Sequence, residues 1–542
     1  MKKFMFWAMA LAVALVSCQK TETEKAPEIT AETLEFTLPA EGTEEEPIYI
    51  TFNSPVDWTA TVSSDAKEWL TISPAKGTAG KASVKVIALS NTESPQERTA
   101  TVSVTASTAK AEFKLTQLGR NDFTFVDADQ EADIDEKGGT IEIEVMTNVE
   151  FNASVYEGSD WLHIVADTKA AYGKQTVKVT VDPYTEYDGE RTGEIKFEVS
   201  GEVIPDGVAY YSITQNGPSS LIWKSSVNDV TGFVPANGAR LAKWGDYLLL
   251  ANGTQVLALD PATGKVLQTI PLPDGYKAES LCVDDAGNVL FAANAAWASE
   301  NADIFKIYTV SSLNETPTCL IEYNAGNIWC LKMCNVRVKG NIKKGNAVIT
   351  AYASYSAYWM AWNVVDGKVG DLSCAVTPYT SNPDCGCVYP AGTSLSDGLW
   401  FIGYGGDYNL RYCASPSKES AAANWTVAFV TGSSWMENYD CISTAKLGDK
   451  EYMAILASCH FNYDSPNLFI LDVTDRANVT KIKEYDFWGH ANWVDNVNQD
   501  WTGVGTFADV CLVAKDNTLT AYYIDAQYGT MGSVLVPITA VK

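Results

Sequence analysis

Long polar stretches in the second half of the chain combine aromatic rings with carboxylate, amide and imidazole side chains. Clear examples are "GGDYN" at 405–409, "CHFNYDSPN" at 459–467 and "WGHANWVDNVNQDW" at 488–501. Aromatic rings are rigid and amphipathic, so they can stack on the CH faces of a sugar while polar neighbours bond to its hydroxyls. The same residue types also suit a protein epitope. These residue types therefore indicate ligand recognition, with a glycan as the first candidate ligand.

The residues of these stretches that we expect to form one ligand-binding surface are Trp297, Tyr355, Tyr358, Tyr404, Asp407, Tyr408, Trp435, Tyr439, His460, Tyr463, His490 and Trp493. Tyrosine and tryptophan have few rotatable bonds, so holding them at a binding surface costs little entropy. Four other tryptophans adjoin apolar runs instead: Trp329, Trp359, Trp362 and Trp400. We expect those four in the core.

Motifs of common hydrolases are missing from the sequence. It contains neither GxSxG nor HExxH, and no phosphate-binding loop. Of its three histidines, His163 lies in the apolar run "WLHIV" and is expected in the core. His460 and His490 stand in polar stretches, where a lone histidine usually serves as a hydrogen-bonding residue. We therefore favour binding without catalysis, and expect no catalytic residue and no cofactor.

An enzyme of the glycosidase type would need two carboxyl groups held close together. The polar stretches contain several candidates for such a pair: Asp407, Glu437, Asp464 and Asp495. A hydrolase or lyase that degrades polysaccharide therefore stays as an alternative. The third alternative is an adhesion protein that grips a protein partner.

A repeated unit must position these stretches. Cysteines at 282, 334, 387, 441 and 511 each open a short apolar run, then a polar turn and a second apolar run, at steps of 52, 53, 54 and 70 residues. A similar unit without the cysteine begins at Arg240. A period near 50 residues with short strands predicts a β-propeller over 221–542, one four-stranded blade per unit. Six units predict six blades, and the long last step leaves room for seven.

The predicted strand order separates long connections from short ones. In an antiparallel four-stranded blade, the connections after the second and fourth strands leave at the same end. Those connections carry the candidate residues, whereas the turns after the first and third strands are short and polar, such as "LSDG" and "KDN". The last unit has only three strands, so we expect Leu221–Val227 to supply its fourth and close the ring.

The cysteines themselves are expected to be structural. Those that open the units would act as small buried hydrophobes on the inner strands. Cys385 and Cys387 are separated by one glycine and lack a second pair or a nearby histidine, so we expect no metal site. Disulfides are chemically possible in an exported protein and are left open.

Residues 30–119 and 121–217 form a second internal repeat. Each copy contains the same three landmark residues: Trp69, Arg98 and Gln117 in the first, and Trp161, Arg191 and Gln215 in the second. Strict alternation marks the middle segments, with Val84 and Val86 on one face of the first copy and Val177 and Val179 on one face of the second. Short strands between Gly, Pro and Asp turns predict an antiparallel sandwich for each copy.

The first copy reads "DW-x-A-x-V", "WL-x-I", "ERTATV" and "LTQ-x-G", a pattern that resembles the BACON domain. That family is Bacteroidetes-associated, often N-terminal and proposed to bind carbohydrate. The resemblance covers both copies, although Phe151 stands where the first copy has Trp58. It implies an immunoglobulin-like sandwich between a lipid anchor and a working domain. Trp69 and Trp161 lie inside apolar runs, so we favour a spacer role over a lectin role for both copies.

The first residues resemble a bacterial lipoprotein signal. Two lysines precede an apolar stretch at 4–16, too short to span a membrane, and "LVSC" ends it at Cys18. The resemblance to a lipobox implies removal of residues 1–17 and lipidation of Cys18, with 18–29 as a flexible tether. The acidic stretch that follows resembles the surface-export signals of Bacteroidetes lipoproteins. We expect an outer-membrane protein, lipid-anchored and exposed at the cell surface.

The charge of the chain excludes two classes of partner. Its formal net charge of −28 is unsuited to nucleic acid, whose phosphates require Lys and Arg, and to docking on an anionic lipid surface. Membrane attachment should therefore come only through the lipid. The expected partners are a glycan or polysaccharide and other outer-membrane proteins of glycan uptake. The ligand and the oligomeric state stay open.

Overall fold

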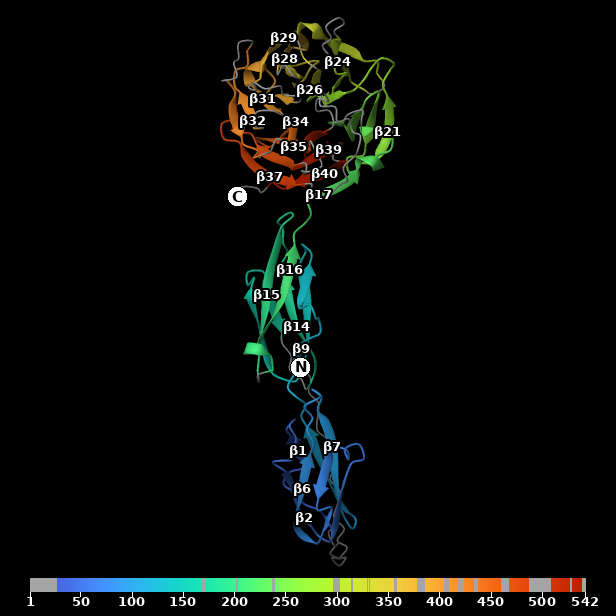
Figure 1. The fold of residues 1–542 in the computed structure, drawn as a ribbon, viewed down its shortest axis with the longest axis vertical. Coiled ribbons are helices and arrows are strands. Elements are labelled where there is room, and N and C mark those ends of the chain that lie inside the picture. The colour runs from blue at the N-terminus through green and yellow to red at the C-terminus, as the bar shows by residue number, and fades with distance from the viewer. Residues whose placement is uncertain are drawn as a thin grey trace, which may run out of the picture. The chain divides into compact units, whose positions relative to one another are not determined.

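The computed structural model describes residues 27–166, 172–200, 203–235, 239–295, 303–312, 315–328, 330, 332–354, 358–377, 386–403, 409–417, 424–432, 437–459, 467–486, 508–526 and 529–538. These residues form strands and short 3-10 turns, which confirms the all-β prediction (Figure 1). The chain divides into two compact units, residues 1–218 and 219–542.

The first copy of the N-terminal repeat contains two facing sheets, with strand orders β1-β8-β7-β3-β5 and β2-β6-β4. One cluster of buried side chains includes Val84 from one sheet and Val102 and Phe113 from the other. The sheets therefore enclose a common core. The strand bounds are β1 (Glu35–Leu38), β2 (Ile48–Ser54), β3 (Trp58–Val62), β4 (Leu70–Ser73), β5 (Lys76–Gly77), β6 (Gly80–Ala88), β7 (Arg98–Ala106) and β8 (Ala109–Gln117).

The second copy repeats this plan, with strand orders β10-β16-β15-β12 and β13-β14-β11-β9. Its core also draws on both sheets, with Val177 from one and Phe197 and Ile213 from the other. The strand bounds are β9 (Phe123–Phe125), β10 (Glu131–Ile134), β11 (Gly139–Thr147), β12 (Phe151–Glu157), β13 (Leu162–Ala166), β14 (Gly173–Val181), β15 (Glu190–Val199) and β16 (Val208–Asn216).

The predicted alternation is confirmed in both copies. Val84 and Val86 are fully buried in β6, and so are Val177 and Val179 in β14, whereas Lys178 between them is exposed. One prediction fails here, because His163 is not a core residue. In β13 it falls on the outer face, half exposed, with its Nε2 3.1 Å from Asp182 Oδ2. The apolar neighbours of His163 occupy the inner positions of the same strand, and period-two alternation turns the histidine outward.

The described part of the second unit contains six four-stranded antiparallel sheets. We number them 1 to 6 by their first strands, which are β18, β22, β26, β30, β34 and β38. Sheet 1 is β18 (Arg240–Trp244), β19 (Tyr247–Asn252), β20 (Gln255–Leu259) and β21 (Val266–Pro271). Sheet 2 is β22 (Ser280–Val283), β23 (Val289–Ala292), β24 (Ile304–Val310) and β25 (Thr318–Asn324). Sheet 3 is β26 (Met333–Gly340), β27 (Ala347–Ala353), β28 (Tyr358–Val365) and β29 (Lys368–Val376).

The later sheets follow the same order. Sheet 4 is β30 (Gly386–Pro390), β31 (Leu399–Gly403), β32 (Leu410–Cys413) and β33 (Thr426–Phe429). Sheet 5 is β34 (Glu437–Leu447), β35 (Lys450–Cys459), β36 (Asn467–Asp472) and β37 (Thr480–Asp486). Sheet 6 is β38 (Ala508–Lys515), β39 (Thr518–Asp525) and β40 (Thr530–Val536), completed by β17 (Leu221–Ser226) from the start of the unit.

The first strands of neighbouring sheets contact one another in chain order, and β38 of sheet 6 also contacts β18 of sheet 1. Figure 1 shows the sheets following one another around a common centre. The first strands of sheets 2 and 3 run in the same direction. The Val336 N–H donates to Ser280 Oγ, and four residues further on the Gly340 N–H donates to Asp285. Equivalent connections of these two sheets therefore leave from the same end of the first strands.

Strand β17 confirms the prediction that the start of the unit completes its last sheet. It pairs antiparallel with β40, with Lys224 opposite Gly532. Its Trp223 is buried and donates from Nε1 to the Pro261 carbonyl, 2.8 Å away in the β20–β21 turn of sheet 1. One residue from the start of the unit thereby links its last sheet to its first.

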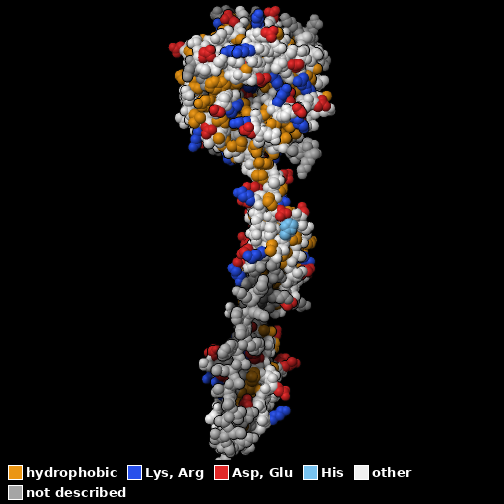
Figure 2. All heavy atoms as spheres, turned by 180° about the vertical axis from the view of Figure 1, so that it is seen from behind, with side chains coloured by type: hydrophobic (Ala, Val, Ile, Leu, Met, Phe, Trp, Pro, Cys, Tyr) orange, Lys and Arg blue, Asp and Glu red, His pale blue; other side chains and the backbone are white. Residues whose placement is uncertain are grey.

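No helix among the described residues has both the length and the apolar character needed to cross a bilayer. Figure 2 shows acidic and basic side chains interspersed over the drawn face of the second unit, with hydrophobic atoms between them. A continuous basic stripe of the kind that nucleic acid requires is not seen on that face.

Candidate functional site

A buried ion pair lies at the centre of the second unit. The Arg337 guanidinium in β26 donates two bonds to the Asp509 carboxylate in β38, 2.7 Å and 3.2 Å long, and both side chains are almost fully buried. A bulge in β26 between Cys334 and Arg337 accompanies this arrangement. Bulges re-aim the side chains that follow them, here toward a strand three sheets away.

Asp509 has hydrogen-bond donors in addition to Arg337. The Leu241 and Val510 N–H groups also donate to the Asp509 carboxylate. Burial is the largest single effect on the pKa of Arg337 and acts to lower it. The charge of Asp509, the hydrogen bonds to it and the neighbouring Cys387 and Cys441 together outweigh burial, so that the pKa is raised well above its ordinary value. The guanidinium therefore stays charged, and its pairing offsets the cost of burial.

The repeated cysteines surround this pair as neutral thiols. All five lie in first strands and are free thiols; four are buried, as predicted, whereas Cys511 is only partly buried. Burial raises the pKa of Cys282 and of Cys511 to about 12. Burial also raises the pKa of Cys387, although Arg337 opposes this. Because the thiolate is the reactive form, these residues are not suited to nucleophilic catalysis.

A second polar cluster closes the same centre near the C-terminal ends of the first strands. The Lys339 ammonium bonds to the Glu451 carboxylate and to Thr444 Oγ1, which bonds in turn to the Tyr389 hydroxyl. Asp285 lies nearby, and its burial raises the pKa of its carboxyl group. The hydrogen bonds of this cluster join three different sheets. Within the described residues, no group of His, Cys, Asp or Glu side chains has the arrangement of a metal site.

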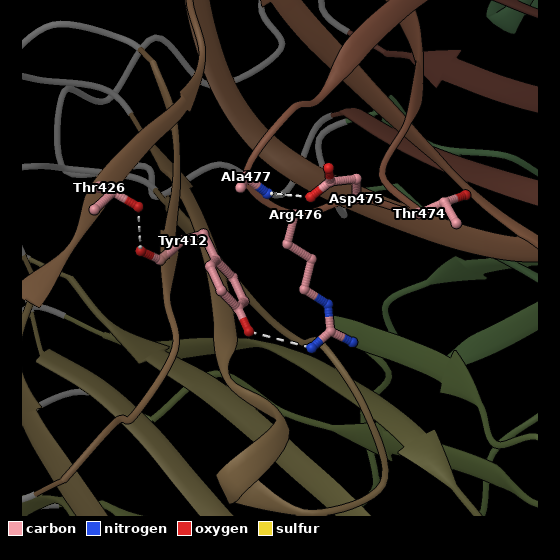
Figure 3. Close-up of a pocket in the computed structure, with 6 residues that line it drawn as sticks. All are labelled: Tyr412, Thr426, Thr474, Asp475, Arg476 and Ala477. Carbon is pink, nitrogen blue, oxygen red and sulfur yellow. Dashed lines mark hydrogen bonds between the residues drawn. The ribbon is translucent and has the colours of Figure 1, made fainter.

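An open surface pocket of about 600 Å³ lies between sheets 4 and 5, at the end of the short turns. Figure 3 shows its lining, which comprises Tyr412, Thr426, Thr474, Asp475, Arg476 and Ala477. The guanidinium of Arg476 points to the Tyr412 hydroxyl, 3.1 Å away, and Thr426 Oγ1 donates to the Tyr412 carbonyl. Arginine, hydroxyl and carboxylate groups line an opening that faces solvent.

Most hydrogen bonds of Arg476 in this pocket stabilise the fold. Its guanidinium also donates to the carbonyls of Asp397 and Ala391, 2.6 Å and 2.7 Å away in sheet 4. Asp475 accepts bonds from Ala477 N–H and Asn478 Nδ2 within its own turn. The pocket residues therefore tie sheet 5 to sheet 4, and the polar capacity left for a ligand is small.

The predicted ligand-binding surface falls almost wholly outside the described residues. This applies to Trp297, Tyr355, Tyr404, Asp407, Tyr408, Trp435, His460, Tyr463, His490 and Trp493, to the side chain of Tyr439, and to the lipidation residue Cys18. Tyr358 is described: it opens β28, is half-buried, and packs against the core of sheets 2 and 3. The core prediction is confirmed for Trp359, Trp362 and Trp400, since each is at most 4% exposed, whereas Trp329 lies outside the described residues.

The landmark residues of the N-terminal repeat form the same cluster in each copy. Arg98 lies over the Trp69 ring at 4.3 Å and donates from Nε to Gln117 Oε1 at 2.9 Å. Arg191 lies over Trp161 at 4.2 Å and bonds to Gln215 at the same 2.9 Å. Both tryptophans are buried, so the prediction that they are core residues is confirmed. Neither ring is free to stack on a sugar.

The sequence analysis missed the residues that close the centre of the second unit. Arg337 and Lys339 lie in the run "CNVRVKG", where two basic residues alternate with apolar ones. Alternation of charges inside an otherwise buried strand was the available signal, because such charges need partners. Asp509 and Glu451 come from stretches far along the chain, and no local pattern connects them.

Comparison with curated proteins returns no match. Among solved structures, a Bacteroides ovatus GH5 xyloglucanase in complex with a XXXG heptasaccharide is 27% identical over 21% of this chain, with a TM-score of 0.15. This chain spans about a fifth of that enzyme, 22% of its length. A protein from Bacteroides thetaiotaomicron is 18% identical over 19% of this chain and 97% of its own, with a TM-score of 0.14. A tandem pair of titin immunoglobulin domains is 10% identical over 35% of this chain and 97% of its own, with a TM-score of 0.23. Scores this low leave the fold and function to be argued from the chain itself.

Two family matches cover the described units. Residues 58–118 and 151–216 match the BACON family, described as "Putative binding domain, N-terminal", so the protein contains two BACON domains. Residues 229–536, more than half of the chain, match a second family and contain all six first strands together with the ion pair at their centre. The chain belongs to the family described as "Domain of unknown function (DUF8500)".

Proposed function

We propose that this protein is a lipid-anchored cell-surface protein that binds a glycan or polysaccharide at one end of a six-bladed β-propeller, with its BACON domains as spacers. The observation that carries the proposal is the common direction of the first strands, seen in sheets 2 and 3. In a propeller, first strands that share a direction send the connections after second and fourth strands to one end, and the sequence assigns the aromatic and Asp/Asn-rich stretches to those connections.

Support for the propeller comes from contacts and strand order. Each of the six described sheets runs in order from its first strand outward, and the first strands contact one another from β18 to β38 and back to β18. Sheet 6 is made of strands from both ends of the unit, which removes a free edge between first and last sheets. Six sheets favour six blades over seven.

Support for an end-on ligand comes from the closed centre. The Arg337–Asp509 pair and the Lys339–Glu451 pair occupy the space between the first strands. A ligand would therefore lie across an end of the propeller. At the end with the short turns lies the pocket of Arg476, whose guanidinium is already bonded to two carbonyls. The end with the long connections offers the residue types that recognise sugars.

Support for the spacer role comes from the buried tryptophans. Arg98 covers Trp69, and Arg191 covers Trp161. Each BACON domain therefore uses the aromatic side chain best suited to stacking on a sugar as part of its own core. The apolar segment that ends at Cys18 supports lipid anchoring in an outer membrane. Other outer-membrane proteins of glycan uptake are the proposed neighbours.

The test is retention on polysaccharide by the full mature chain. We expect Trp435→Ala, Trp493→Ala and Tyr408→Ala, combined, to abolish pull-down by an insoluble polysaccharide that retains the wild type. The matched control is Trp244→Ala, because Trp244 ends β18 next to the short β18–β19 turn, at the opposite end, and donates to the Gly287 carbonyl. Unchanged retention in the triple variant would rule out this face.

The same full-length protein distinguishes the proposal from the two alternative functions, adhesion and catalysis. An adhesion protein would bind a protein target whose deglycosylation leaves binding unchanged. A hydrolase or lyase would release reducing sugar or unsaturated product from a polysaccharide panel. Either result would replace the proposal.

A further inference from the structure

The link between the two BACON domains, residues 118–122 between β8 and β9, is bonded to both domains. On the side of the first domain, the Arg120 N–H donates to the Ser94 carbonyl, 2.9 Å away. On the side of the second domain, Thr147 Oγ1 donates to the Asp122 carbonyl at 2.8 Å. Both domains belong to the same compact unit. The link is therefore held by both of the domains that it connects.

One side chain, that of Asn148, joins the first domain, the link and the second domain. Asn148 lies in the β11–β12 connection of the second domain and is half-buried. Its Nδ2 donates to the Pro95 carbonyl of the first domain at 3.1 Å and to the Arg120 carbonyl of the link at 2.8 Å. Its Oδ1 accepts the Asp122 N–H at 2.8 Å. Both amide hydrogens and the amide oxygen are thus used in a single bridge.

The Pro95 carbonyl belongs to a loop that is itself fixed to the first domain. Asn91 is buried, and its Nδ2 donates to the carbonyls of Gln96 and Leu118, which ties this loop to the end of β8. Gly119 lies against the same loop, since a Cβ at this position would be 2.3 Å from the Pro95 backbone. Any larger residue would push the link and the loop apart. The loop is therefore a firm support for the bond from the second domain.

The fold of a BACON domain does not require this bridge, because the first copy lacks it. Ser54 Oγ donates to the Val56 carbonyl in the first copy, and Thr147 Oγ1 makes the equivalent bond, two residues ahead, in the second. The residues enclosed by these bonds are Pro55 and Asn148, and Pro55 is exposed and has no side-chain donor. The bridging amide is thus found in the copy that follows another BACON domain.

We propose that this joint makes the two BACON domains move as one rigid body, so that the pair is a stiff spacer. A polar, glycine-containing link such as "LGRND" would behave as a flexible coil if it lacked these bonds. Here, rotation of one domain against the other would break bonds from the link or from Asn148. The inference deepens the spacer role and rests on the proposed function for its meaning: a stiff pair keeps its two ends at a fixed separation, which a flexible pair does not.

The experiment measures the distance distribution between one label in each BACON domain of the full mature chain. Tyr49 in β2 and Tyr210 in β16 are exposed, so each can be replaced by p-acetylphenylalanine and coupled to a nitroxide without labelling the cysteines. Pulsed electron–electron double resonance then gives the distribution. A Gly-Ser-Gly-Ser insertion after Gly119 provides the flexible reference. We expect the wild-type distribution to be narrower than that reference by about twofold or more.

Two variants approach the joint from opposite sides. Asn148→Ala removes the bonds to Pro95 and Arg120, and Gly119→Ala forces the link away from its supporting loop. We expect each to broaden the distribution toward that of the reference. Gly119→Ala leaves every side chain of the second domain in place, so its broadening cannot come from a local fault around Asn148. The matched control is Asn152→Ala, an exposed asparagine of β12 outside the joint, which should keep the wild-type width.

A wild-type distribution as broad as that of the insertion variant would overturn the proposal, and so would an unchanged width in Asn148→Ala or Gly119→Ala. Retention on polysaccharide, measured on the same labelled proteins, keeps this result separate from the proposed function. A broad wild-type distribution with normal retention refutes the stiff joint and leaves glycan binding in place. A narrow distribution without retention does the reverse.

Discussion

Arg337 and Asp509 form a bidentate ion pair between the first strands of sheets 3 and 6, which are as far apart as two sheets can be in the order of contacts. The pair therefore joins opposite parts of the second unit directly. Because both groups are almost fully buried, their energetic balance depends on each having the other.

Removing one partner should be costly, and removing both should cost less than the sum. We expect Arg337→Met or Asp509→Asn to lower the free energy of unfolding of the second unit by about 3–5 kcal/mol, since each leaves a buried charge or donor without its partner. In the double variant neither charge remains, and the side-chain amide introduced by Asp509→Asn would keep an oxygen for the Leu241 N–H. Urea unfolding followed by tryptophan fluorescence measures the four proteins of the cycle.

The exposed pair of Lys450 and Asp472 provides the control. It has a similar length, 2.9 Å, but the lysine side chain is half exposed, so Lys450→Met should change stability hardly at all. Strict additivity of Arg337→Met and Asp509→Asn would contradict the role assigned to the central pair.

Burial of Asp285 predicts a pH dependence with a definite sign. Burial raises the pKa of its carboxyl group above the ordinary 3.8, so the folded state holds the proton more tightly than the unfolded state. The contribution of Asp285 to stability is then complete below pH 3.8 and is lost as pH rises through the raised pKa. Asp285→Asn removes that loss while keeping an oxygen for the Gly340 N–H.

We therefore expect Asp285→Asn to gain stability relative to the wild type between pH 4 and neutral pH. Urea unfolding at several pH values measures the difference between the two proteins. Asp449→Asn, in the exposed β34–β35 turn, serves as the control and should show no such trend. A difference that is flat with pH, or that falls, would refute the sign.

The central ion pair marks the limit of what local patterns can predict. The repeated cysteine run correctly predicted the first strand of sheets 2 to 6. Such a strand can be recognised from its own apolar residues and from the polar turn that follows it. The strand at Leu221 was predicted because the last unit visibly lacked one. Asp509 is 172 residues from Arg337 in the sequence. Their contact depends on a bulge in β26, which cannot be predicted from the amino-acid composition.

His163 shows the same limit on a smaller scale. An apolar run identified its strand correctly, but the side on which a residue falls depends on register, and register is set by pairing with β14. The ligand-binding residues were predicted from long connections. Most of them lie outside the described part of the chain, so that part of the prediction stays a prediction.

The cluster of tryptophan, arginine and glutamine in each BACON domain predicts that arginine cannot be replaced by lysine. Arg191 stacks on Trp161 and donates to Gln215 and to the Asp182 carbonyl, which uses the planar fork of its guanidinium. We expect Arg191→Lys and Arg191→Met both to destabilise the second sandwich, by about 2 kcal/mol. Hydrogen exchange of peptides from β14 and β15 measures this locally.

The control for that prediction is Arg120→Met. Arg120 is about half exposed, with a 3.5 Å contact to Asp122, and should leave hydrogen exchange unchanged. Exchange in Arg191→Lys equal to that of the wild type would show that charge alone suffices at this position.

The contacts of Trp223 predict how much strand β17, at the start of the second unit, contributes to the stability of that unit. The ring fills space between sheets 6 and 1, and its N–H bonds to Pro261. We expect Trp223→Ala to lower the free energy of unfolding by about 3–5 kcal/mol, and Trp223→Phe by less, because phenylalanine restores volume without the hydrogen bond. Urea unfolding of the second unit again provides the measurement.

Gly264 offers a sharper version of the same test. A Cβ at this glycine would lie 2.4 Å from the Trp223 ring, and its φ of +69° also disfavours other residues. Gly264→Ala should therefore destabilise the wild type through both the clash and backbone strain. In the Trp223→Ala background the clash is absent and only the strain remains, so the two substitutions should cost less together than the sum of their separate effects. Additive costs would mean that the ring does not fill the space beside Gly264, and that sheets 6 and 1 are joined by other contacts.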